Sequence, residues 1–350
     1  MLDYPWTDAP APGAAIALAP GVLWLRMPMP MAPRHINLWA IRDRDPQTGL
    51  RGWTIVDAGL HTQETIDHWE ALLSPSGALE GEPILRVVVT HLHPDHAGMA
   101  GWLTRRFDAP LSMTEREHRA CCAMFDEDGR EAPDDVLAFN RRAGWSDEQI
   151  TRFRSRFGSF GRLIHPPPRE YRVLRDGETL QIGDYAWRVV VGRGHSPEHA
   201  CLHCPGLKLF ISGDQVLPRT SSNVSVVPSE PDGDPIADWF DSIDRIRETV
   251  PDDVLVLPAH NLPFRGLHAR LDQLATTTTS SLDALRSSLD CPRRVVDMFA
   301  PLFGRPILEY ELLILATGEG QAHINHLLQR REAVACRIEN GVAWYCAAAA

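Results

Sequence analysis

The sequence predicts an α/β fold with a cluster of polar side chains at the carboxyl ends of its strands. Short runs rich in β-branched residues alternate with segments of helical periodicity along the 350 residues. The strand-like run 84–89 leads directly into residues 90–98, which contain three histidines and one aspartate. His195, Asp214 and His260 each follow a further strand-like run. Side chains gathered in this way at strand ends are typical of a metal site on an α/β scaffold.

Residues 90–98 place four candidate ligands between a strand and a helix expected over 97–107. Side chains two apart in an extended segment point the same way, so His91 and His93 can bind one ion together. Asp95 and His96 come after the chain has turned, and they face a second position. Imidazole and carboxylate groups suit zinc, and also iron or manganese. The alternative, a histidine-rich surface turn, leaves the three downstream ligands unexplained.

The order His-x-His-x-Asp-His, then His, Asp and His, resembles the metallo-β-lactamase superfamily over roughly residues 20–267. The resemblance implies an αββα sandwich and two metal ions per chain. Zinc is the expected metal, and iron and manganese are the alternatives. The implied ligands are His91, His93 and His195 for the first ion, Asp95, His96 and His260 for the second, and Asp214 as the bridge. The bridging aspartate favours the two-metal hydrolases of the glyoxalase II and ribonuclease type over the true β-lactamases.

The resemblance also implies the reaction and the supporting residues. A metal-bridging hydroxide would attack a carbonyl or phosphorus centre, and Asp95 would act as the catalytic residue that orients the hydroxide and accepts a proton. Asp57, in Asp-Ala-Gly after the run 52–56, resembles the superfamily residue that braces the metal loop; an ordinary turn aspartate is the alternative. The segment 194–199 resembles Gly-His-Thr-Pro-Gly-His of glyoxalase II-like hydrolases, and His199 is expected to support the site without binding metal.

Two segments are candidates for substrate contact. Between residues 110 and 168 strand signals stop, and helices are expected over 114–125 and 146–157, as in a helical insertion. Arg152 and Arg156 lie in an arginine- and phenylalanine-rich part of it, which could form an anion-binding wall for a coenzyme A ester or RNA. We favour the alternative, a solvated helix with inward phenylalanines and paired arginines. The loop that begins after Asp214 contains Gln215, Arg219 and Asn223. Their side chains would either contact substrate or form hydrogen bonds with the backbone of the loop.

The chain divides, on this interpretation, into a catalytic domain over 1–267 and a tail over 268–350, with residues 1–20 loosely ordered. Helices are expected over 268–289, 291–303, 307–315 and 320–330. Strands at 334–338 and 342–345 flank Asn340-Gly341, a strong hairpin signal. Short helices followed by a hairpin resemble a small winged-helix domain. We interpret it as a packing or dimerisation element, which leaves a homodimer open.

Composition limits the partners. The formal net charge of −11 argues against bulk affinity for nucleic acid or anionic membranes. The seven cysteines have no framework spacing and are expected to be reduced thiols in a cytoplasmic protein. Neither a signal-peptide pattern nor a membrane-length apolar window is recognisable.

The sequence therefore predicts a two-metal hydrolase of a small thioester, ester or lactone. A single-strand-specific endoribonuclease is the second hypothesis, favoured by the tail and opposed by the net charge. An iron persulfide dioxygenase shares the motifs but holds a single iron. A non-catalytic winged-helix regulator with a relic site is the remaining alternative, and the complete ligand set argues against it.

Overall fold

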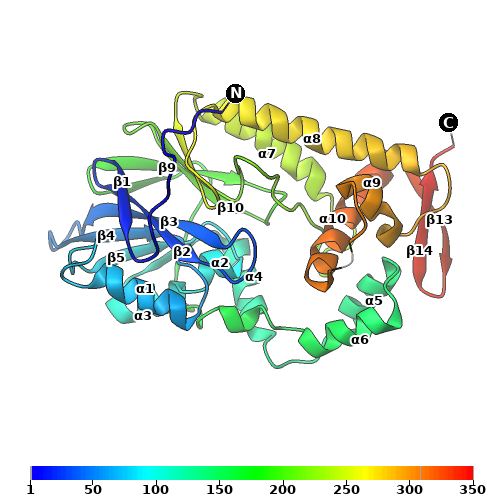
Figure 1. Ribbon diagram of the computed structural model, residues 1–350, viewed down its shortest axis with the longest axis horizontal. Helices are drawn as coiled ribbons and strands as arrows, with labels where there is room; N and C mark the ends of the chain where they lie inside the picture. Colours follow the sequence, from blue (N-terminus) through cyan, green and yellow to red (C-terminus); the bar gives the residue numbers. More distant parts are fainter. Residues whose placement is uncertain (1, 308, 350) are drawn as a thin grey trace.

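The computed structural model describes residues 2–307 and 309–349. Two β-sheets stack face to face, and helices cover the outer face of each sheet (Figure 1). This arrangement is the αββα sandwich that the sequence predicts. It places the carboxyl ends of several strands at one edge of the sandwich.

The first sheet has seven strands in the order of the sequence. The strands at its start pair antiparallel, and those from β4 onwards pair in parallel. They are β1 (Ala15–Ala19), β2 (Val22–Pro28), β3 (His35–Arg44), β4 (Arg51–Val56), β5 (Ile84–Val88), β6 (Leu111–Met113) and β7 (Arg172–Val173). Strands β1 and β6 differ from the expectation, in which residues 1–20 are loosely ordered and strand signals stop between 110 and 168. Both strands are short. Each takes its extended conformation because it pairs with a neighbouring strand, β2 or β5, that the sequence predicts more clearly.

The second sheet has five strands in the order β12-β11-β10-β9-β8. These strands are β8 (Thr179–Ile182), β9 (Tyr185–Gly192), β10 (His199–Cys204), β11 (Leu209–Gly213) and β12 (Leu255–Pro258). Strand β10 runs antiparallel to both β9 and β11, and β11 runs parallel to β12. Strands β9, β11 and β12 therefore all end at the same edge.

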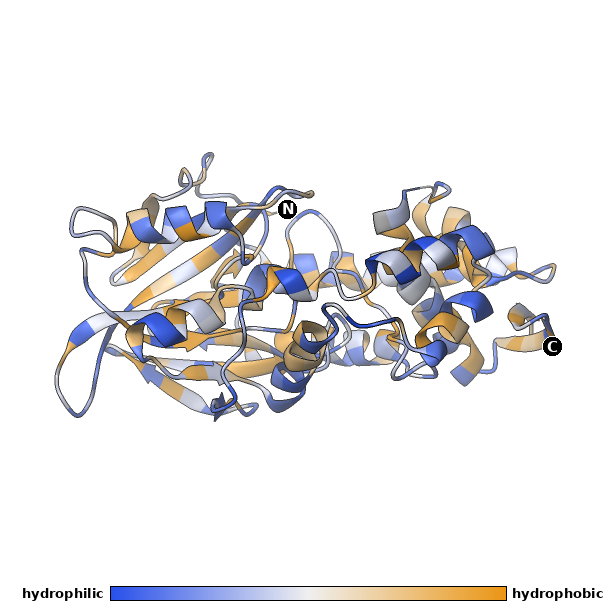
Figure 2. Cartoon of the chain, turned by 90° about the horizontal axis from the view of Figure 1, so that it is seen from below, coloured by the Kyte–Doolittle hydropathy of each residue, from blue (hydrophilic) through white to orange (hydrophobic). Residues whose placement is uncertain are grey.

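The core consists of three apolar layers separated by the two sheets. Helices α1 (Gln63–Leu73) and α3 (Ala100–Phe107) pack on the first sheet, and α7 (Pro235–Thr249) and α8 (Leu267–Ser288) pack on the second. Strand β2 shows how one strand serves two layers. Trp24 lies between the sheets, whereas Leu25 and Met27 face the helical side, because successive strand side chains point to opposite faces. Figure 2 shows helices on which polar and apolar residues alternate, as this packing requires.

The segment between β6 and β7 is mainly helical. It contains α4 (Glu115–Asp126), α5 (Asp134–Arg142), α6 (Asp147–Arg156) and the 3-10 helix η1 (Gly161–Leu163). The sequence predicted α4 and α6 but not α5. Helix α6 is capped by Ser146, whose side chain accepts from the Gln149 N–H in a capping box. Within the described ranges 2–307 and 309–349, no helix is long and apolar enough to cross a lipid bilayer.

The tail contains η2 (Val295–Met298), α9 (Phe299–Phe303), α10 (Tyr310–Gln329) and a hairpin of β13 (Ala333–Glu339) and β14 (Val342–Ala347). The helix expected over 291–303 is thus shorter, and Leu308, in the next expected helix, lies outside the described residues. The two helices expected over 307–315 and 320–330 are one continuous helix, α10. Gly318 does not end it: a Cβ there would lie 2.8 Å from the Ser225 side chain, so this glycine permits a close approach.

Helix α8 joins the two parts of the chain. Its first half, including Leu271, packs in the sandwich, and its second half, including Leu285, packs with the tail. The proposed domain boundary at residue 267 stays a prediction, because one helix contributes to both cores.

Replacing Leu285 with alanine should destabilise the protein by about 2–5 kcal/mol, because a buried leucine is lost from the tail core and a cavity remains. Urea unfolding monitored by circular dichroism measures this. Ser287→Ala, at an exposed position of the same helix, should change stability by less than about 0.5 kcal/mol. Equal stability of the two variants would contradict the packing described for α8.

Candidate metal centre

All seven expected ligand positions lie at one edge of the sandwich. His91 and its neighbours follow β5, and His195, Asp214 and His260 follow β9, β11 and β12. The shared direction of β9, β11 and β12 brings their three following loops together. The fold thus assembles residues that are up to 169 positions apart in the sequence, from His91 to His260.

The ligand atoms form two adjoining groups, each with its atoms within 4.8 Å of one another: His91, His93, His195 and Asp214, and Asp95, His96 and His260. In the first group, His195 Nε2 lies 3.2 Å from His91 Nε2 and 3.5 Å from Asp214 Oδ2. In the second, His260 Nε2 lies 3.4 Å from Asp95 Oδ2. Donor atoms about 2.0–2.1 Å from a tetrahedral zinc are separated by similar distances.

Asp214 lies between the two groups. Besides its approach to His195, its Oδ2 is 3.6 Å from His96 Nε2 and its Oδ1 is 3.4 Å from His260 Nε2. A carboxylate placed between two sets of imidazoles is suited to bridge two cations. The positions therefore fit the ligand assignment that the resemblance implied, which stays a prediction until a metal is measured.

Four of the five imidazoles have a hydrogen-bond partner at the nitrogen that faces away from the cluster. His91 Nδ1 lies 3.1 Å from Thr90 Oγ1, and His96 Nδ1 lies 2.7 Å from Asp57 Oδ2. The Nδ1 atoms of His195 and His260 contact backbone carbonyl oxygens, those of Asn223 and His35, at 2.8 and 2.9 Å. Such contacts fix the ring and the tautomer, so Nε2 is left to bind a cation.

Asp57 forms hydrogen bonds with the loop that carries His91 and His96. Its carboxylate accepts from the Thr90 N–H at 2.8 Å and from the Thr90 hydroxyl at 2.9 Å, in addition to its contact with His96. Its backbone has a φ of 61°, a left-handed conformation that aspartate tolerates better than most residues. These contacts are those of a bracing residue.

His199 supports Asp214 from the side. Its Nε2 accepts the Asp214 N–H at 3.1 Å, so this nitrogen is not available to a metal. Its ring also stacks on that of His91, with centroids 4.7 Å apart. Burial holds the pKa of His199 well below its usual value, which keeps the ring neutral and able to accept.

The charges of the cluster fit a cation. Burial lowers the pKa of His93 to about 3 and holds that of His91 well below its usual value, so both stay neutral. Against the effect of burial, His260 and His96 hold the pKa of Asp214 well below its usual range. Among the described residues, His96 Nε2 and Asp214 Oδ1 are buried atoms with no hydrogen-bond partner, and both face the cluster. Neutral imidazoles, ionised carboxylates and orphaned buried atoms are what a divalent metal site requires.

The residues expected to contact substrate lie in varied surroundings. Gln215 is buried, and its Nε2 donates to the Arg193 carbonyl at 3.1 Å. Asn223 turns its side chain towards α10, where Nδ2 donates to Glu319 at 2.7 Å. Arg219 is exposed. For Gln215 and Asn223, then, the structure shows the loop-supporting contacts that were the alternative to substrate binding.

Arg152 and Arg156 lie on α6 over the ring of Tyr310, at 4.3 and 5.4 Å from its centroid. They thus help to dock α6 on the first turn of α10. This is a packing contact, and a role of either arginine in binding an anion stays a prediction.

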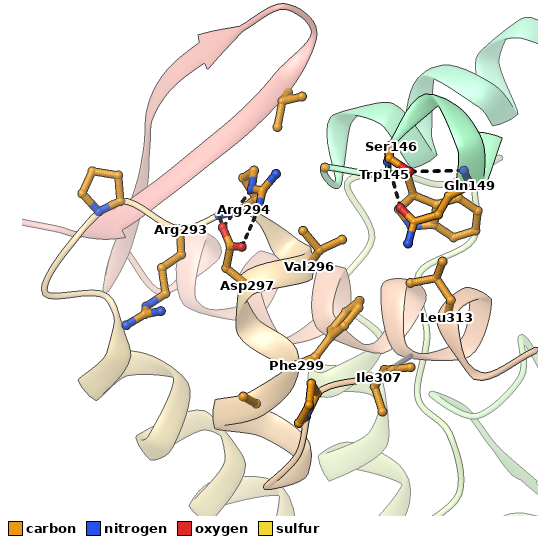
Figure 3. A pocket seen from close by; sticks show the side chains of 15 residues that line it. Trp145, Ser146, Gln149, Arg293, Arg294, Val296, Asp297, Phe299, Ile307 and Leu313 are labelled. Atoms are coloured by element: carbon orange, nitrogen blue, oxygen red, sulfur yellow. Dashed lines mark hydrogen bonds and ion pairs between the residues drawn. The ribbon is translucent and has the colours of Figure 1, made fainter. Parts of the chain in front are cut away.

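A separate cavity of about 670 Å³ lies beside the same helices (Figure 3). Its walls include Trp145 and Gln149 of the insertion, and Arg293, Phe299 and Leu313 of the tail. None of the seven expected metal ligands lines it. The cavity therefore does not belong to the metal cluster.

Two supporting groups were not anticipated from the sequence. The carbonyl of His35, at the start of β3, holds His260. The carboxylate of Glu117, fully buried in α4, accepts hydrogen bonds from Leu92 and Ser196, in two of the loops that carry expected ligands. A backbone carbonyl leaves no sequence signal. The sequence signal for Glu117 is weak: it is a charged residue on the same side of α4 as His118 and Cys121, which are also buried.

The comparisons with known proteins agree with this geometry. The family model of the metallo-beta-lactamase superfamily matches residues 33–289. The protein named acyl-coenzyme A thioesterase MBLAC2 of Gallus gallus is 26% identical over 288 residues, covering 81% of this chain and 92% of that protein. The probable metallo-hydrolase YqjP of Bacillus subtilis is 22% identical over 336 residues, covering 93% and 97%. The crystal structure of a beta-lactamase domain protein from Burkholderia ambifaria has a TM-score of 0.90 and 40% identity, covering 99% and 98%.

The fold and the ligand cluster define a metal-dependent hydrolase. The family match covers more than half of the chain, and the chain belongs to the metallo-β-lactamase superfamily.

Metal binding should release protons. Burial alone would lower the pKa of His260, but Asp214 and Asp95 raise it to about 10, so the metal-free protein holds a proton there at neutral pH. A coordinating imidazole must lose that proton, so the apparent affinity for cobalt(II) should rise as the pH rises from about 6 to about 8. Calorimetric titrations in buffers of different ionisation enthalpy measure the protons released.

The Asp214→Asn variant should release fewer protons per cobalt bound, because it removes a charge that keeps His260 protonated. Binding heats that do not depend on the buffer in the unaltered protein would contradict the assignment of His260.

Proposed function

We propose that the chain is a two-metal hydrolase, with zinc as its resident metal, that cleaves the thioester bond of a small acyl thioester such as an acyl-coenzyme A. The observation that carries the proposal is the position of Asp214 between two groups of ligand atoms. The match to a protein named acyl-coenzyme A thioesterase over 81% of the chain supports the thioester as the bond that is cleaved.

The proposed ligands are His91, His93 and His195 for one ion and Asp95, His96 and His260 for the other, and Asp214 is shared between them. When bound, a pair of divalent cations supplies a hydroxide at neutral pH and polarises the carbonyl oxygen of a substrate. His93 and Asp95 are partly exposed, whereas His91 and His96 are fully buried and the side chain of His195 is only 5% exposed. The substrate would therefore approach from the side of His93 and Asp95.

Asp95 is the proposed proton acceptor. Its Oδ2 lies 3.4 Å from His260 Nε2 and 3.6 Å from His96 Nε2, and its partial exposure leaves room for a reacting group. The pKa of Asp95 is lowered, because His96 and His260 outweigh the effect of burial, so the carboxylate is ionised at neutral pH. A thiol leaves readily as a thiolate, since its pKa is about 8.5, and this makes a thioester a less demanding substrate than an ester of an alcohol.

Esters and lactones are cleaved by the same chemistry, and RNA would be a different class of substrate. The net charge of −11 opposes RNA, because a phosphate backbone requires basic contacts. The proposed location is the cytoplasm, whose reducing conditions suit the seven free thiols.

The test is thiol release from a panel of acyl-coenzyme A and acyl-glutathione thioesters, monitored with a chromogenic disulfide. The zinc-loaded protein should turn over at least one member. Asp214→Ala should lower the rate by at least about 1,000-fold, because the loss of about 4 kcal/mol of transition-state stabilisation corresponds to that factor. Asp232→Ala, at an exposed position of the loop that follows Asp214, is the matched control and should retain the full rate.

Lactones, simple esters and single-stranded RNA complete the panel. Hydrolysis of a lactone or ester without thioester turnover would replace the substrate class and keep the metal centre. Cleavage of RNA would favour the ribonuclease. Full thioester turnover by Asp214→Ala would contradict the two-metal assignment.

A further inference from the structure

Glu117 is a buried carboxylate outside the expected ligand set, and it lies where the insertion meets the metal centre. It belongs to the first turn of α4, directly after β6. Its side chain is fully buried, and its hydrogen-bond partners come from the two loops that present His91, His93 and His195. A buried carboxylate is costly unless such partners compensate it.

The two oxygens of Glu117 serve different loops. Oε2 accepts the N–H of Leu92, the residue between His91 and His93, at 2.9 Å. Oε1 accepts the hydroxyl of Ser196 at 2.7 Å and the N–H of Glu198 at 2.6 Å. Ser196 directly follows His195. One carboxylate therefore fixes the backbone beside three of the expected ligands.

Neighbouring residues of α4 strengthen this contact. The Thr114 hydroxyl donates to the Glu198 carbonyl at 2.8 Å, and the Arg116 N–H donates to the Glu198 carboxylate at 3.2 Å. The start of α4 is thus docked on the loop that carries His195. The two metal-binding segments also share the backbone hydrogen bond from the Ala200 N–H to the Thr90 carbonyl, at 2.8 Å, but this bond lies on the strand side of the ligands.

We propose that Glu117 is a positioning residue that sets the distance between the His91–His93 turn and His195, and thereby the geometry and affinity of the first metal position. The inference rests on the metal centre of the proposed function and is independent of which substrate is cleaved. Glu117 acts through Leu92 and Ser196 and touches neither substrate nor metal. The insertion, in this account, contributes to the metal centre from outside the sandwich.

Glu117→Gln is the sharpest variant. A glutamine has one acceptor oxygen, so it can hold either Leu92 or the Ser196–Glu198 pair, and its NH₂ group faces a donor on the other side. The volume of the side chain is nearly unchanged. The variant therefore breaks the link between the two loops while retaining the packing of α4.

Asp43→Asn is the matched control. Asp43 is also buried and accepts several hydrogen bonds, including those from Thr54 at 2.6 Å and the Gly183 N–H at 2.8 Å. It lies near the end of β3, whereas His35 at the start of the same strand contacts the metal centre. Eight residues of strand separate the two by about 27 Å.

The experiment loads the full chain with cobalt(II) as the probe and measures its affinity by competition with a chromophoric chelator, together with its visible absorption spectrum. Urea unfolding of the metal-free proteins reports stability separately. Glu117→Gln should bind the first cobalt about 10- to 100-fold more weakly, as is usual when a group that supports a metal ligand is lost, and its spectrum should change. Asp43→Asn should lower stability but leave the affinity and the spectrum unchanged.

Equal cobalt binding by the unaltered protein and Glu117→Gln would overturn the proposal, as would equal losses in both variants. If Glu117→Gln does not fold, Ser196→Ala tests the same link with a milder change; it should weaken the first cobalt several-fold, and unchanged binding would overturn the proposal. An unaltered protein that binds no cobalt would overturn the metal centre and this inference together. One that binds cobalt but cleaves no thioester would overturn the thioesterase assignment alone.

Discussion

The constraint on which this structure depends is the placement of two carboxylates, the buried Asp214 and the largely buried Asp95, among five imidazoles at one edge of the sandwich. Buried negative charge is strongly unfavourable unless cations or hydrogen bonds compensate it. The raised pKa of His260 and His96, and the orphaned Asp214 Oδ1, both indicate that positive charge belongs at this position. The surrounding loops can then be understood as the means of holding those ligands in place.

Support for the ligands comes from every part of the chain. Within the sandwich, Asp57 and His35 hold His96 and His260. From the tail, α10 holds the long segment after Asp214. Its Gly318 carbonyl accepts the Val226 N–H at 3.0 Å, and Glu319 accepts from the same Asn223 whose carbonyl contacts His195. Figure 1 shows α10 beside α7, between the sandwich and the hairpin. The tail is thus continuous with the site through hydrogen bonds.

Much of this arrangement could be predicted from sequence, because local patterns determine it. Strand runs followed by histidine or aspartate indicated the loops that carry the expected ligands, and Asn340-Gly341 indicated the hairpin of β13 and β14. Features that depend on distant partners could not be predicted. Strand β6 is three residues long and exists through its neighbours. The helices expected over 307–315 and 320–330 are one helix, in which Gly318 makes room for a segment about 90 residues earlier in the sequence. Glu117 acquires its role only when two loops converge on it.

The most direct measurement is the metal content of the purified protein, determined by inductively coupled plasma mass spectrometry against protein concentration. The account predicts two divalent ions per chain, with zinc predominant, and loss of both from a protein treated with a chelator at acidic pH. A single iron per chain would contradict the two-metal hydrolase and favour the dioxygenase. A protein that holds no metal, even after incubation with zinc, would contradict the central claim.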